Sequence, residues 1–223
     1  MKMKISFMVF LFLSYSSLVL AFWPNVALPP QSSRQEVAKD LRVNGLDMQL
    51  INFTSRLSER QVINYYRNKW ANKYAESESG PWQQISQMRD NYFITVQVQE
   101  NEFAGSTGRI SILSRPKKVP EVGKNIPMMD SSKILNEVIS KDKLTTSTVV
   151  LLSNSYSADD NAEFYKKYYS QIGWKIMMNQ NMQERGISLV FKKDAMEKLI
   201  TIKNVTGGST VVMNKVKQRG WFN

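Results

Sequence analysis

The chain has 223 residues, a formal net charge of +11 at pH 7, and neither histidine nor cysteine. The lack of both residue types excludes Ser-His-Asp and Cys-His nucleophile systems, disulfide scaffolds and the usual zinc sites. The positive charge favours anionic partners, such as nucleic acid, lipid headgroups, lipopolysaccharide or an acidic protein, although excess lysine also serves solubility.

The N-terminal residues have the pattern of an export signal. Two lysines precede an apolar stretch over residues 5–20, and Val19 and Ala21 suit the −3 and −1 positions of a cleavage site. A retained membrane anchor is the alternative, but serines interrupt a stretch that is short for a spanning helix. We therefore predict a signal peptide over 1–21, cleavage after Ala21, and a periplasmic protein.

The first module is expected over residues 22–113. Residues 33–41 are compatible with a short helix that Asn44-Gly45 ends, and residues 48–54 alternate like a strand. Ser58 and Gln61 form a capping box before an amphipathic helix with an aromatic face, which should end before Gly80. Strands are predicted over 82–88, 92–99 and 109–113.

A linker and a second module follow. Residues 114–130 carry three prolines and several basic residues, which predicts a semi-extended, solvated linker. The second module, residues 131–216, should contain a short helix over 133–139, a strand over 146–153, and a helix capped by Ser157 and ended by Gly173. Strands are expected over 174–179, 186–192, 198–203 and 209–215, before a basic and aromatic tail over 217–223.

The two modules resemble each other at a constant spacing of 99 residues. Ser58 matches Ser157, and Tyr66 matches Tyr165, with apolar strand positions in step before them. We predict an α+β protein of two tandem similar modules, each an antiparallel sheet packed against one main amphipathic helix. The aromatic helix faces then belong to the cores and do not form a ligand platform.

No catalytic or cofactor motif is present. The sequence contains no Walker loop and no dinucleotide fingerprint, and residues 105–108 have the composition of a turn. We interpret the acidic pair Asp159-Asp160 as helix capping and the pair Glu76 and Glu78 as part of a solvated loop. We predict no enzyme, no cofactor and no metal; a hydrolase based on carboxylates is the least favoured alternative.

Basic residues, partly interleaved with aromatic ones, are the candidate partner-binding groups. Such residues can hold a nucleic acid by charge and stacking, or bind an anionic membrane surface. Open sheet edges offer strand addition as another route to a protein partner. The candidates lie in the linker, at the end of the last predicted strand and in the tail: Lys117, Lys118, Lys124, Lys215, Lys217, Arg219, Trp221 and Phe222.

The helix that ends at Gly173-Trp174, followed by antiparallel strands, resembles the helix-grip modules of Gram-negative envelope assembly proteins of the BamC type. This resemblance implies a non-catalytic periplasmic adaptor or accessory protein in envelope, secretion or pilus assembly, with protein partners. The chain lacks the lipid-anchoring cysteine of that lipoprotein. A binder of an anionic polymer or lipid, such as DNA or lipopolysaccharide, is the alternative function.

Overall fold

The structure is a computed structural model that describes residues 23–218 except 103, 117 and 183–185, so the predicted signal peptide lies outside the described residues. The described residues form two helices, α1 (Glu59–Trp70) and α2 (Ala158–Gln171). The strands of the first half are β1 (Ser32–Val43), β2 (Leu46–Ser55), β3 (Ala75–Ser79), β4 (Trp82–Arg89), β5 (Tyr92–Glu100) and β6 (Ser106–Ser114). The second half contains β7 (Lys133–Lys141), β8 (Thr145–Asn154), β9 (Lys175–Asn181), β10 (Ile187–Lys193), β11 (Met196–Val205) and β12 (Gly208–Gln218).

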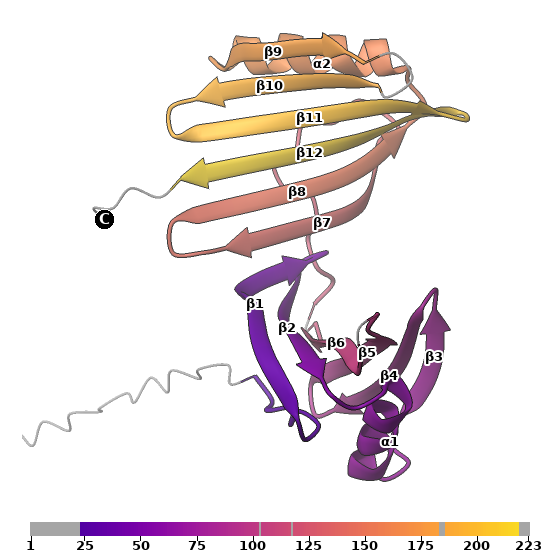
Figure 1. Cartoon of the computed structure of the whole chain (residues 1–223). Coiled ribbons are helices and arrows are strands. Elements are labelled where there is room, and N and C mark those ends of the chain that lie inside the picture. The colour runs from indigo at the N-terminus through magenta and orange to yellow at the C-terminus, as the bar shows by residue number, and fades with distance from the viewer. Residues whose placement is uncertain (1–22, 103, 117, 183–185, 219–223) are drawn as a thin grey trace, which may run out of the picture.

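All these strands belong to one antiparallel sheet with the order β3-β4-β5-β6-β2-β1-β7-β8-β12-β11-β10-β9 (Figure 1). The predicted α+β class, with a separate sheet and one main helix in each module, is therefore wrong. The protein is mostly β, and two short helices accompany a single large sheet. The reason is that β1 and β7, both expected to be helices, are strands that extend the sheet of each module and then pair with each other.

The segment around Asn44-Gly45 explains why β1 is a strand. Both residues have positive φ, 48° and 75°, and Val43 pairs directly with Leu46. A two-residue loop with two positive φ angles is the favoured connection of a β-hairpin. The Asn-Gly pair, interpreted from the sequence as the end of a helix, therefore turns β1 back onto β2.

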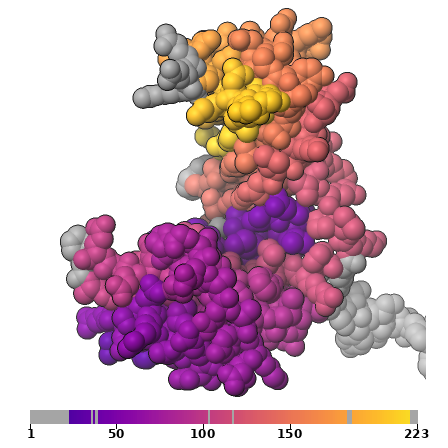
Figure 2. Space-filling model, turned by 90° about the vertical axis from the view of Figure 1, so that its right-hand side faces the viewer, coloured from indigo at the N-terminus to yellow at the C-terminus, as the bar shows by residue number. Residues whose placement is uncertain are grey.

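The two halves meet where β1 pairs with β7. Only four residue pairs form this joint, and Leu41 lies opposite Ser140, its counterpart at the spacing of 99. The side-chain oxygen of Asn44 accepts from the Glu137 amide at 2.8 Å, and the Asn44 amide donates to the Glu137 carbonyl at 2.8 Å. Figure 2 shows the result as two lobes with the indigo β1 segment at the narrower waist between them.

Each helix packs on the outer strands of its own half, α1 on β4 and β5 and α2 on β9, β10 and β11. The predicted capping boxes form at Ser58 with Gln61 and at Ser157 with Asp160. However, α1 ends at Trp70, earlier than predicted, because the chain continues into the edge strand β3. No helix in the described part of the chain has the length and hydropathy of a membrane span.

The halves also share buried details. The hydroxyls of Ser106 and Ser209 donate to the carbonyls of Leu57 and Tyr156, each of which precedes a helix N-cap. One core position differs by a compensating exchange of volume. Phe53 lies opposite Gly108 in the first half, whereas Leu152 lies opposite Val211 at the same place in the second half.

This exchange predicts strong coupling between Phe53 and Gly108. A Cβ added at Gly108 would lie 2.0 Å from the Phe53 ring, so we expect Gly108→Val alone to destabilise the protein by about 2 kcal/mol or more. Phe53→Leu alone should cost about 1 kcal/mol, and the double variant, which copies the second half, should recover most of the loss. Chemical denaturation of the four proteins measures the cycle, and additive losses would contradict the exchange.

Candidate binding surfaces

The helix-free face of the second half carries a patch of aliphatic side chains. The residues that alternate with the patch residues along each strand, such as Leu152 and Ile200, point into the core. The patch residues therefore point to the opposite face of the sheet. Leu199 and Val212 are 38% and 41% exposed. In this aliphatic patch Leu151 lies opposite Val212, and Val190 lies opposite both Leu199 and Met178. The aliphatic patch is defined as Val149, Leu151, Met178, Val190, Leu199 and Val212.

The first half shows that the fold does not require this patch. The strand register places Asn52 opposite Arg109 where the second half has Leu151 and Val212. Likewise Ser86 lies opposite both Thr95 and Ala75 where the second half has Val190, Leu199 and Met178. Because the same architecture forms with polar or small residues at these positions, the aliphatic patch needs another explanation, and exposed apolar clusters commonly mark interaction sites.

The other face of the second half contains a buried lysine. Lys198 is 6% exposed, and its Nζ donates to the Tyr169 hydroxyl at 2.6 Å. The same Nζ lies 3.8 Å from the Tyr169 ring centroid and 4.8 Å from that of Trp174. Burial, and to a lesser extent the neighbouring charge of Lys215, lowers the pKa of Lys198 to about 7. The candidate residue Lys215 is half-buried and lies directly opposite Lys198.

Two other candidates, Lys118 and Lys124, line a groove of about 750 Å³ at the junction of the halves. Arg42 and Arg115 also line it, but so do three carboxylates: Asp47, Glu121 and Glu137. Asp47 lies 3.4 Å from the Arg42 guanidinium, and Glu121 lies 3.5 Å from the Lys124 ammonium. The groove is therefore mixed in charge and is not a uniform polyanion channel.

The remaining candidates are placed as follows. Lys217 is exposed near the end of β12, on the same side of that strand as Lys215, and neither lines the junction groove described above. Lys117, Arg219, Trp221 and Phe222 lie outside the described residues. The structure thus brings Lys118 and Lys124 together at the junction, and Lys215 and Lys217 together on β12.

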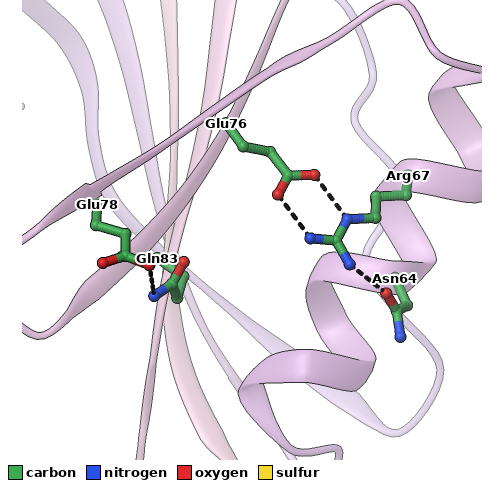
Figure 3. A network of polar contacts seen from close by, with 5 residues as sticks. All are labelled: Asn64, Arg67, Glu76, Glu78 and Gln83. Atoms are coloured by element: carbon green, nitrogen blue, oxygen red, sulfur yellow. Dashed lines mark hydrogen bonds and ion pairs between the residues drawn. The ribbon is translucent and has the colours of Figure 1, made fainter.

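The acidic pairs do not converge on a reaction centre. Glu76 and Glu78 lie on β3, and Figure 3 shows them engaged with different partners. Glu76 accepts two hydrogen bonds of 2.6 Å from Arg67, which lower the pKa of its carboxyl group, whereas Glu78 accepts from Gln83. They belong to an edge strand, so their assignment to a solvated loop was wrong. Asp160 caps α2 as predicted, and no metal-binding group of carboxylates occurs among the described residues.

Lys198 and the aliphatic patch were missed by the sequence analysis for one reason. Matching residues of the two halves are 99 positions apart as far as the helices, but this separation changes after them. Met196 pairs with Lys217 in the second half as Tyr92 pairs with Ser114 in the first half. Matching residues are therefore 104 positions apart on β11 and 103 positions apart on β12. A comparison with the changed spacing would have shown lysine in place of Ile94.

No protein-family model, curated protein or solved structure matches this chain. The two halves of the chain therefore serve as references for each other.

The buried lysine predicts a pH-dependent stability. Between pH 7 and 9.5 the unfolded state holds a proton on Lys198 that the folded state releases, so stability should rise with pH in this range. Lys198→Ile, which copies Ile94, should remove that rise and raise the stability at pH 7 by about 1–3 kcal/mol. Thermal unfolding across this range measures both effects, with the exposed Lys203→Ile as control. An unchanged pH dependence in Lys198→Ile would refute the assignment.

Proposed function

We propose that this protein is an exported, periplasmic and non-catalytic adaptor or accessory protein that binds a protein partner in envelope, secretion or pilus assembly. The single observation that carries the proposal is the aliphatic patch, because at five of its six positions, all except Val149, the first half has polar or small residues and the architecture still forms. The export signal and the resemblance to helix-grip modules support the setting and stay predictions.

The chemistry of the aliphatic patch suits a folded or extended protein surface. The valine, leucine and methionine side chains of the aliphatic patch offer dispersion contacts and desolvation but few directional groups. The six strands β7 to β12 span about 24 Å from the first strand to the last at the usual strand spacing. A sheet face of this width is comparable in size to one side of a standard protein–protein interface, which is about 800 Å².

The edges of the sheet support strand addition less well. The edge strand β3 is short and carries two glutamates, and β9 contains a bulge at Met177, where Val190 pairs with Met178 but Phe191 pairs with Ile176. Charged side chains, short length and bulges are devices that protect edges from pairing. The sheet face is therefore the stronger candidate for the partner.

Site-specific cross-linking tests the proposal, since the chain has no native cysteine. A photo-cross-linker on Thr201→Cys, which lies opposite Val212 beside the patch, should capture a protein in the native periplasm, and the same probe on Gln97→Cys, its counterpart in the first half, should not. The adduct should form at about 0.3 M salt, because apolar contacts are less sensitive to salt than polyanion binding. Mass spectrometry should identify an envelope, secretion or pilus component.

A matched pair of variants completes this experiment. Leu199→Thr with Val212→Arg gives the second half the residues of the first and should abolish capture with the fold intact. Val119→Arg, at a linker position that is 93% exposed, makes the same change of residue type and should leave capture unchanged. Capture only of nucleic acid or lipopolysaccharide, equal capture from Gln97→Cys, or only a covalent dimer of this chain would each overturn the adaptor function.

A further inference from the structure

The helix-bearing face of the second half holds three lysines in adjacent register positions. Lys198 lies opposite Lys215, and Lys215 lies opposite Thr148 on the next strand. One step along the same face, Lys217 lies opposite Thr146. Side chains directly opposite each other in an antiparallel pair have Cβ atoms about 5 Å apart, so these lysines and threonines form one compact cluster.

The first half again supplies the reference. At the positions of Lys198 and Lys215 it carries Ile94 and Ile112, which lie opposite each other and are fully buried. Replacing this apolar pair by two lysines places like charges directly opposite and buries one of them, and both changes are unfavourable. The architecture does not require the lysines, so their retention here points to a function.

Counter-charges are missing from the cluster. No carboxylate of the described chain forms an ion pair with Lys198, Lys215 or Lys217. The nearest acidic residue on this face is Glu137 on β7, which lies opposite Val150 and whose carboxylate accepts a hydrogen bond from the Gly123 amide. Asp40 lies one strand further away, opposite Lys141 and so beyond Thr146. The hydroxyl of Tyr169 satisfies the Lys198 ammonium as a hydrogen-bond acceptor but contributes no negative charge.

We propose that Lys198, Lys215 and Lys217, with the hydroxyls of Thr146 and Thr148, form a binding site for a single phosphate group. Lysine ammonium groups act as compact point charges that commonly bind phosphate, and threonine hydroxyls donate to its remaining oxygens. The cluster is compact and spans three strands, so it suits one phosphate group better than the extended backbone of a nucleic acid. A free phosphorylated molecule and a phospholipid headgroup share this chemistry.

The site has a built-in proton signature. The titratable groups that face Lys198 are Tyr169 on α2, Lys215 on β12 and Lys193 on β10. Lys193 lies two residues beyond Phe191, the residue opposite Lys198, and its Nζ donates to the Ile172 carbonyl. Near pH 7 a fraction of Lys198 is neutral because of its burial. A bound phosphate favours the ammonium form, so binding should be accompanied by proton uptake from the solution.

Isothermal titration of the mature chain with inorganic phosphate and pyrophosphate, and co-sedimentation with phosphatidylglycerol or phosphatidylcholine vesicles, test the site. Binding of the free anions assigns a soluble phosphate ligand. Binding only of phosphatidylglycerol vesicles assigns a lipid headgroup. In the first case, titrations near pH 7 in buffers of different ionisation enthalpy should show proton uptake. Failure to bind any of these probes would overturn the proposal.

Variants distinguish the site from general positive charge. Lys198→Ile with Lys215→Ile, the residues of the first half, should weaken binding by about tenfold or more and abolish proton uptake. The control, Lys192→Ile with Lys203→Ile, removes the same charge from exposed positions on the opposite face and should change binding little. Equal losses in both would refute the site.

Two further variants keep the test independent of folding and of the proposed function. Lys217→Ser, at an exposed position where the first half has Ser114, should weaken binding without disturbing the core. Leu199→Thr with Val212→Arg, on the opposite face, should leave phosphate binding unchanged. Loss of phosphate binding in that variant, or its retention in Lys217→Ser, would contradict this location.

Discussion

The pairing of β1 with β7 is the constraint on which the rest of the molecule depends. Four residue pairs, supported by the reciprocal hydrogen bonds between Asn44 and Glu137, convert two small sheets into one. Because the linker amide of Gly123 also donates to the Glu137 carboxylate, the same glutamate ties the joint to the chain that crosses it. Glu137 thus uses its backbone to bond Asn44 and its buried carboxylate to bond Gly123, an arrangement that sets the register of the joint by geometry more than by strength.

The duplication is also the most useful physical reference within the chain. Two copies of one architecture separate the residues that the fold needs from those it does not. The shared serine hydrogen bonds and capping boxes belong to the fold, as does the exchange of Phe53 and Gly108 for Leu152 and Val211. The lysines of β11 and β12, and the aliphatic patch at every position except Val149, belong to one copy only, and both impose a cost in desolvation or in exposed apolar area.

These two features lie on opposite faces of the same half. Side chains alternate across a strand, so Leu199 and Lys198 are neighbours in sequence yet point in opposite directions. The second half can therefore present an apolar face to a protein and a basic cluster to a phosphate group at once, whereas the first half presents neither set at these positions. The charge of the chain, which suggested polyanion binding in general, is balanced by acidic residues in the junction groove and is left unbalanced on β12.

The sequence by itself determined the local structure: the capping boxes at Ser58 and Ser157, the alternating strands and the repetition, since each depends on residues close together in the chain. It did not determine that residues 33–41 and 133–139 are strands, because their hydrogen-bond partners lie in β2, β8 and each other's half. Lys198 and Lys215 were likewise separate basic residues until β11 and β12 paired. Only the tertiary structure, through cross-strand register, decided which side chains share a face and hence where a partner or an anion can bind.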